Sequence, residues 1–510
     1  MNKTKLIFAA ALLFTASCAN EDVNKDNGNP NNQGMTTFVS GDEPATRTSM
    51  DHTAGGKGKF FWTTGDNIWI DNAGTPESNT SSSITGKTDY AKFYFASTLT
   101  GTSYPVTYTG KSSTKSNEVT IAASQTQSAP NNTDHFANSG DCGTATATGS
   151  SNEFTFKLKH QAAYLCILPR NENTELGGNL YLQKIVITSN NNIAGIYTLS
   201  SSGLTLKSGG SNTITLTTGS GNGFSMSNAT TNTNNSVYMV IAPGTHTLTI
   251  DCYVKDPITE VGATLTQTVS TTFAANTITD ITADVTPTRT NYPGNGYYMW
   301  DAAVGQHYWA GYEWDNPVES QRQQPTINGT ENSAYAPDGF PESATNPRGY
   351  RDDVVLGAPA NRSAANCPNI NECLWYVIHG EPHWDNTTLW TTMGHLYVGG
   401  MWLKRKAGIT GYNVNNSPNG TDYRNIDFYY QNENIITGKP SNQSDFFYLP
   451  ALGCYNLNKT LTSVGERGLY WMSSPSPSNR TYARNIAFTS TFMGVYAGGR
   501  NYGNHLWTAQ

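Results

Sequence analysis

The sequence is poor in charge, in cysteine and in long apolar runs. Charged residues make up only 14% of the 510 residues, and the net charge of −7 is spread along the chain. We therefore expect neither nucleic acid nor acidic lipid as a partner. Beyond the N-terminus, no apolar segment has the roughly 20 residues that span a bilayer. The chain has seven cysteines, and the six after Cys18 are an even number that permits disulfides without requiring them.

Common catalytic signatures are also missing: the chain has no Gly-x-Ser-x-Gly elbow, no P-loop and no EF-hand loop. We expect no enzyme activity and no cofactor. The strongest metal-like cluster is "HGEPHWD", with His379, His383 and Asp385, followed by His395. Its internal glycine and proline disfavour the helix that the i, i+4 zinc geometry needs, so we assign no metal. A metal-dependent hydrolase centred on His379, His383 and Asp385 stays as an alternative, with zinc or calcium as the ion.

The chain begins with an export signal and a tether. Basic residues precede the short apolar run Leu6–Phe14 and small residues follow it, which predicts a signal peptide over residues 1–17. The residues leading into Cys18 resemble the lipobox of bacterial lipoproteins, and the acidic pair behind it resembles the surface-export signal of Bacteroidales lipoproteins. The resemblance implies that Cys18 carries acyl chains, palmitate among them, and anchors a precursor in the outer membrane. Residues 18–34 are polar and predict a lipidated flexible tether. An ordinary signal peptide with an incidental cysteine is the alternative.

Short strands of period two dominate from residue 35 to about residue 287. The stretch "HTLTIDCYV" places Leu248, Ile250, Cys252 and Val254 on one face, as a half-buried strand does. Glycine, asparagine and serine turns separate many such strands, and no long amphipathic helix appears, which favours β-sandwiches. We expect an N-terminal sandwich over 35–175 and a second over 176–287. The polar stretch 169–179 is the expected boundary between them.

The composition changes after a linker at residues 288–296. Nine of the eleven tryptophans and 19 of the 28 tyrosines follow residue 286. Residues 297–510 therefore form an aromatic, loop-rich domain, which serves either as a recognition surface or as the core of a loop-rich fold. Exposed His383, Trp384 and Trp471 are the candidate ligand contacts, although a core position is the preferred interpretation of Trp471.

The chain also resembles two known families. Residues 35–286 resemble the fimbrillins of Bacteroidales, the subunits of type V pili, through "ATRTSMD", "FWTTGDNIWI", "FKLKHQAAYLCI" and "NIAGIYTLS" in that order. Residues 447–507 resemble a Fibrobacter-major-paralogous, C-type-lectin-like domain through "FYLPALG", "GERGLYWMSSP", "ARNIAF" and "GGRNYG". The stretch "NCPNINECLWYVIHGEPHWD" is similar to C-terminal domains of pilus tip proteins. The expected fold is mainly β: two fimbrillin-type sandwich lobes followed by a loop-rich, α+β C-type-lectin-like tip domain.

The cysteines of this last domain predict one disulfide and leave the partner of a third cysteine open. "CPNINEC" could close a small disulfide loop between Cys367 and Cys373 in an oxidising compartment. The lectin-like family usually has a cysteine near its end, whereas this chain reads "YGNHLWTAQ" there, so a partner for Cys454 stays open.

The fimbrillin resemblance implies a mode of assembly. An Arg-specific protease would cut after Arg47, so that the mature chain starts at Thr48 and the first strand, within residues 35–47, leaves the fold. A strand of another pilus subunit would fill the groove by donor-strand exchange. Because an aromatic domain follows where a donor strand would extend, we expect a tip subunit at the cell surface that adheres to host or microbial glycans or glycoproteins. A second cut at Arg289 is conceivable.

Two simpler alternatives remain at this stage. Arg47 can be an ordinary surface arginine of a polar loop. The protein would then be a non-polymerising, glycan-binding lipoprotein of the cell surface that keeps its lipid.

Overall fold

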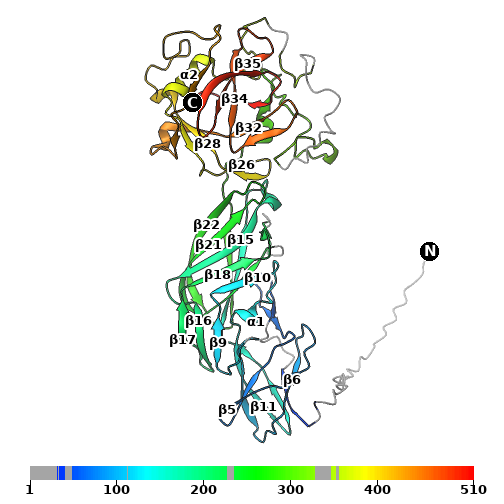
Figure 1. Ribbon diagram of the computed structural model, residues 1–510. Helices are drawn as coiled ribbons and strands as arrows, with labels where there is room; N and C mark the ends of the chain where they lie inside the picture. Colours follow the sequence, from blue (N-terminus) through cyan, green and yellow to red (C-terminus); the bar gives the residue numbers. More distant parts are fainter. Residues whose placement is uncertain are drawn as a thin grey trace, which may run out of the picture.

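The computed structural model describes residue 32 and residues 34–40, 49–111, 113–226, 235–327, 346–351 and 355–510. The signal peptide, Cys18 and the expected processing residues Arg47 and Thr48 lie outside these described residues. The described chain is mainly β, as predicted, and forms three units in a row: an N-terminal unit, a middle unit and a C-terminal domain (Figure 1). None of its helices has the length and the apolar character needed to cross a membrane.

The N-terminal unit is built on one nine-stranded sheet. Its core is aromatic, with Trp62, Phe93, Tyr108 and Phe154 all at 0% exposure. In sheet order the strands are β5 (Thr75–Ser78), β4 (Trp69–Asn72), β8 (Ser103–Tyr108), β11 (Gly143–Ser150), β12 (Glu153–Phe156), β1 (Thr36–Ser40), β7 (Ala91–Phe95) and β6 (Ser81–Ser82), and β13 (Lys159–His160) pairs with β11.

The middle unit contains three sheets around a separate apolar core. The predicted alternation holds here, since Leu248, Ile250, Cys252 and Val254 are all buried on one face of β21. The strands are β10 (Ser124–Gln127), β18 (Thr213–Thr218), β15 (Tyr181–Ser189) with β19 (Phe224–Ser225), β21 (Gly244–Lys255) and β22 (Gly262–Phe273); β20 (Val237–Ile241), β14 (Ala163–Arg170) and β23 (Ile278–Asp284); and β17 (Gly203–Ser211), β16 (Ala194–Ser200) and β9 (Glu118–Ile121). The hairpin β2 (Ser49–Asp51) and β3 (Lys59–Phe61) and the short α1 (Phe136–Ser139) pack against it.

Strand pairing divides the first two units differently from the boundary expected at 169–179. Strands β9 and β10 already belong to sheets of the middle unit, and the chain then returns to the N-terminal sheet for β11 to β13. Strand β14 lies between β20 and β23 in the middle unit, and its residues 163–169 are all buried. A strand apolar on both faces is a central strand. The polar stretch 169–179 therefore connects two strands of the middle unit.

The C-terminal domain combines two larger sheets, a hairpin and one α-helix of ten residues in the described chain. Its strands are β24 (Tyr297–Tyr298), β37 (Asn504–His505), β34 (Gly468–Pro475), β35 (Tyr482–Phe488), β36 (Met493–Gly499), β29 (Tyr430–Asn432), β32 (Leu452–Tyr455) and β33 (Leu461–Val464); β30 (Ile436–Thr437), β25 (His383–Asp385), β28 (Gly400–Lys404) and β31 (Phe446–Pro450); and the hairpin β26 (Trp390–Thr392) and β27 (His395–Tyr397), with α2 at Ile370–His379. Short 3-10 turns lie at Gly177–Asn179, Gly294–Gly296, Glu319–Gln321, Lys406–Gly408 and Gln443–Asp445.

Helix α2 begins with a capping box. The Asn369 side chain accepts hydrogen bonds from the backbone N–H groups of Asn371 and Glu372, and the Glu372 carboxylate accepts from Asn369 N at 2.8 Å. These reciprocal bonds satisfy backbone donors that a helix start leaves open. The helix ends at His379, and Glu381 then has a positive φ of 44°.

A polar joint connects the C-terminal domain to the middle unit. The Asp256 carboxylate of the middle unit accepts hydrogen bonds from the His395 ring, at 2.9 Å, and from Leu396 N, at 3.0 Å. The Thr259 hydroxyl donates to Leu396 O at 2.7 Å, and the Leu396 side chain is part of the middle unit's core. Burial opposes ionisation of Asp256, but the hydrogen bonds outweigh it and hold its pKa below the usual value. The hairpin β26–β27 therefore contacts the middle unit through buried hydrogen bonds and through the apolar Leu396 side chain.

The six cysteines in the described part of the chain are all free and buried. This corrects the expected bond between Cys367 and Cys373. Cys373 faces the main core from α2, whereas Cys367 lies before the helix in a small cluster with Trp300. Cys166 and Cys252 are small buried core residues of the middle unit.

Candidate functional site

Strand β1 occupies an interior position of the N-terminal sheet. It runs antiparallel to β7, with Phe38 opposite Phe93, and parallel to β12, with Phe38 opposite Phe154. Both of its backbone edges are therefore paired. The first described strand of the chain is thus surrounded by later ones, and its absence would leave a slot with an unpaired edge on each side.

Side chains fix β1 in this slot at its centre and at both ends. The Phe38 ring is at 0% exposure, and its centroid lies 5.0 Å from the ring centroids of Phe95 and Phe154. At one end the Ser40 hydroxyl accepts from the Trp62 indole N–H at 2.9 Å. At the other end the Thr36 hydroxyl donates to a backbone carbonyl at 2.8 Å. The strand is held by packing and by hydrogen bonds.

The chain that follows β1 belongs to a different unit. From Ser49 onward it forms the β2–β3 hairpin, whose Met50 is buried in the core of the middle unit. Met50 N donates to the Thr133 hydroxyl at 2.6 Å, and that hydroxyl donates to Met50 O at 2.8 Å. The expected cut after Arg47 thus falls between a strand held by the N-terminal sheet and a hairpin held by the middle unit.

A cavity of about 620 Å³ lies beside β34, β35 and β36 of the C-terminal domain. Its buried lining residues include Trp471, Asn485 and Asn504, each at 5% exposure or less. The lining also contains more exposed aromatic and basic side chains, which are Tyr350, Arg467, Tyr482, Tyr496 and Tyr502. The cavity therefore combines aromatic faces with amide and guanidinium groups.

Among the described residues, two polar atoms of the cavity lining have no hydrogen-bond partner. They are Arg467 Nε and Asn504 Oδ1, and both atoms are buried. A buried polar atom without a partner costs about 1–3 kcal/mol, so a ligand or water that supplies one is favoured. Tyr496 is oriented by donating its hydroxyl to Gln431 Oε1 at 2.6 Å.

The cavity gathers one of the three predicted ligand contacts. Trp471 is fully buried, and its indole N–H donates to Tyr298 O at 2.7 Å, so only part of its ring is offered to the cavity. His383 and Trp384 lie in β25, in the other sheet, and Trp384 is part of the core. The sequence analysis missed Tyr482, although it directly precedes the lectin-like segment "ARNIAF".

The histidine and aspartate cluster considered for a metal is not brought together. Asp385 accepts hydrogen bonds from the backbone and hydroxyl groups of Thr387 and Thr388 and, at 2.9 Å, from the Trp402 indole. Burial opposes its ionisation, but these bonds prevail and lower the pKa of Asp385 to about 2. In the described ranges, the only group of three metal-binding side chains does not include His379, His383 or Asp385. Asp385 therefore acts as a structural anchor of its loop.

Comparison with known proteins gives distant structural neighbours. No family model matches the chain, and no characterised protein matches its sequence. Among solved structures, a candidate cell adhesion protein from Bacteroides uniformis is 16% identical over 50% of this chain and 93% of its own, with a TM-score of 0.32. A candidate cell adhesion protein from Bacteroides ovatus is 14% identical over 44% of this chain and 84% of its own, with a TM-score of 0.29.

A fimbrial protein from Bacteroides ovatus aligns over 91% of this chain and 97% of its own, at 9% identity and a TM-score of 0.26. At scores this low the aligned parts superpose poorly. The likeness therefore carries no argument on its own, and the function of the chain has to be inferred from its own geometry.

Proposed function

We propose that this chain is the precursor of an adhesive pilus tip subunit of the fimbrillin type, exported to the cell surface through a lipid on Cys18. Proteolysis after Arg47 would release β1, and a strand of another subunit would take its place. The observation that carries the proposal is the position of β1: it is an interior strand, paired on both edges, and the next described element is a hairpin of another unit. The sequence resemblance to fimbrillins supports the same assignment.

The energetics of the slot fit a long-lived joint. Phe38 and Val39 are both buried, at 0% and 7% exposure, and two such side chains contribute a gross burial of roughly 3–6 kcal/mol. Backbone hydrogen bonds to β7 and β12 add to this value. An incoming strand with a large apolar residue opposite Phe154 would recover the same contacts, and strand addition of this kind gives affinity through the backbone and specificity through the pockets.

The arrangement of the units suits a tip position. The N-terminal sheet that holds β1 is at one end of the molecule and the C-terminal domain with the cavity is at the other (Figure 1). A subunit that accepts a strand at one end would present the cavity at the free end of a fibre. Aromatic faces beside amide and guanidinium groups suit a sugar, which offers apolar C–H faces and hydroxyl groups, so a glycan is the ligand class that we propose.

The first experiment determines the N-terminus of the protein from shed surface fibres and from whole cells. Material that starts at Thr48 in fibres supports the proposal. The Arg47→Ala variant should then stay cell-bound and uncut, whereas the control Arg289→Ala, which changes an exposed arginine of the linker, should assemble normally. If every molecule keeps acylated Cys18 and none enters fibres, the tip assignment has to be abandoned.

The cavity also fits a second function, a non-polymerising lipoprotein that captures glycans at the cell surface. It would keep its lipid, stay uncut at Arg47 and still bind sugars. Glycan-array binding by the purified protein tests the cavity in both cases. We expect Tyr482→Ala to lose binding and Tyr253→Ala, a tyrosine on β21 of the middle unit, to keep it. Equal binding by both variants would rule out the cavity as the glycan site.

A further inference from the structure

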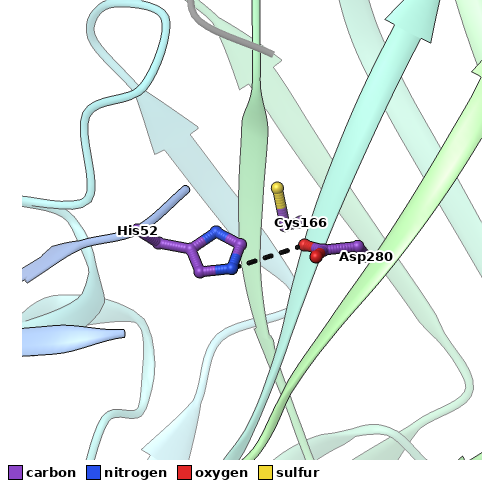
Figure 2. A group of neighbouring side chains, drawn as sticks. All are labelled: His52, Cys166 and Asp280. Carbon is purple, nitrogen blue, oxygen red and sulfur yellow. Dashed lines mark ion pairs between the residues drawn. The ribbon is translucent and has the colours of Figure 1, made fainter. Parts of the chain in front are cut away.

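Three neighbouring strands of the middle unit place a cysteine, a tyrosine and an aspartate in one row across the sheet. Cys166 on β14 is the register partner of Tyr238 on β20 and of Asp280 on β23. Residues in one row of a sheet point to the same face. His52, which follows β2, reaches over this row from the hairpin (Figure 2). A ligand atom of His52, of Cys166 and of Asp280 all lie within 4.8 Å of one another.

His52 presents a free nitrogen to this group. Its side chain is only 1% exposed, and the ring Nε2 has no hydrogen-bond partner among the described residues. The nearest acid is Asp280 Oδ1, at 3.5 Å. Burial lowers the pKa of His52 despite the attraction of Asp280, so the ring is neutral near pH 7. The other nitrogen, Nδ1, lies 3.3 Å from the Tyr238 hydroxyl, and a proton there leaves the Nε2 lone pair facing the group.

The remaining groups are oriented in the way that outer-shell contacts orient metal ligands. Gly55 N donates to Asp280 Oδ2 at 2.6 Å, which leaves Oδ1 on the side of His52 and Cys166. Burial, together with the charge of Asp280, raises the pKa of the Cys166 thiol to about 12. A cation between them would reverse this effect, because a metal-bound thiol is deprotonated. A hydrogen bond to the second nitrogen of a ligand histidine is the usual arrangement.

We propose that His52 Nε2, Cys166 Sγ and Asp280 Oδ1 bind one Zn²⁺ ion, with water as the fourth ligand. One nitrogen, one thiolate and one carboxylate oxygen are ligands that zinc takes in tetrahedral sites. Bonds of about 2.0–2.3 Å place such ligands within roughly 4 Å of one another, so the side chains need to close by about 1 Å. The Asp280 side chain is 26% exposed and gives the ion a path from solvent.

The site would fasten the hairpin to the sheet. His52 directly follows the three-residue strand β2, whereas Cys166 lies on the central strand β14 and Asp280 on its neighbour β23 in the middle unit. A bound ion would link the hairpin to the sheet. Among the described strands, the short strand β2 pairs only with β3 and does not supply such a link. If Arg47 is cut as proposed above, the ion would hold the new N-terminal segment after β1 has left. This consequence depends on the proposed function, but the metal site itself does not.

The test measures metal binding by the exported chain, without its signal peptide and with Cys18→Ala, purified without chelator. Elemental analysis after equilibration with Zn²⁺ should find one zinc per chain. Co²⁺ titration should produce a thiolate-to-cobalt charge-transfer band in the near ultraviolet. We expect Cys166→Ser to abolish the band and His52→Gln to weaken Co²⁺ binding at least tenfold. Cys252→Ser, which changes another buried free thiol of the middle unit, should leave both unchanged.

Several results would overturn the proposal: less than one-tenth equivalent of zinc together with no cobalt band, a band that persists in Cys166→Ser, or an equal loss in Cys252→Ser. Because His52 lies on a hairpin rather than in the core sheet, His52→Gln tests the site even if Cys166→Ser fails to fold. The uncut Arg47→Ala precursor should bind the ion as tightly as the parent chain. Failure of fibre assembly and failure of metal binding are therefore separate results.

Discussion

Truncation of Phe38 to alanine tests how strongly the N-terminal sheet depends on β1. The ring is at 0% exposure, stacks on Phe154 at 5.0 Å and meets Phe95 edge-on at 5.0 Å and Tyr104 at 6.2 Å. Removing it leaves a hole among three rings on three different strands, β7, β8 and β12. Phenylalanine-to-alanine changes in cores cost about 3–5 kcal/mol, and the upper part of that range applies where neighbours cannot collapse into the hole.

We therefore expect Phe38→Ala to destabilise the N-terminal unit by about 4 kcal/mol. Since every 1.4 kcal/mol is a factor of ten, the protection of amides against hydrogen exchange should fall by roughly a thousandfold where exchange requires β1 to leave. Mass spectrometry of the uncut, signal-free precursor measures this in peptides that cover β7 (Ala91–Phe95) and β12 (Glu153–Phe156). Peptides from β21 and β22 should keep their protection, because those strands belong to the middle unit.

Thr37→Ala is the matched control, since Thr37 lies in the same strand and is only partly buried. It should change protection by less than about tenfold, as surface changes usually stay near 0.5 kcal/mol. If Phe38→Ala leaves β7 and β12 within twofold of the parent protein, β1 does not hold that sheet together. The reasoning from packing would then be refuted.

Three further changes probe the C-terminal domain and its joint. Because the folded pKa of Asp385 is about 2, below its usual value, its hydrogen bonds stabilise the domain at neutral pH and are lost as pH falls from about 4 to 2. The difference in free energy of unfolding between the parent and Asp385→Asn, about 2 kcal/mol from urea titrations at neutral pH, should therefore shrink over that range. His395→Ala breaks the buried pair with Asp256, at a cost of about 3 kcal/mol, and should speed limited proteolysis between the middle unit and the C-terminal domain at least tenfold. Gly453→Ala places a Cβ at 1.9 Å from Thr462 O at a φ of +64°, so thermal unfolding should show a C-terminal domain destabilised by more than 2 kcal/mol.

Local pattern predicted the strands well wherever one face of a strand meets water. The alternation in "HTLTIDCYV" located β21 and its buried face. The same method misplaced β14, because a central strand buried on both faces has no alternation to read. No single boundary separates the first two units, because β9 and β10 of the middle unit precede β11 to β13 of the N-terminal sheet.

The cavity and the joint depend on residues that are far apart in sequence. Tyr350, Tyr482 and Tyr502 meet at one cavity only because β34, β35 and β36 pair and a distant loop lies beside them. His395 was weighed as a metal ligand beside its sequence neighbours, yet it bonds to Asp256, 139 residues away. The residue types alone indicated that these side chains can bind a ligand or form hydrogen bonds. They did not indicate which partners the side chains have.

The row formed by Tyr238, Cys166 and Asp280 could be predicted only with knowledge of the strand pairing and its register. Cys166 and Asp280 are neighbours because β14 pairs in parallel with β23, 114 residues later, and a shift of one residue in that register would turn Asp280 to the other face. Apolar pattern fixes the face of β14 weakly, since its residues 163–169 are buried on both sides. The register is instead set by the neighbouring strands of the whole unit. A site of this kind follows from tertiary pairing, and its residues are informative in the sequence only after that pairing is known.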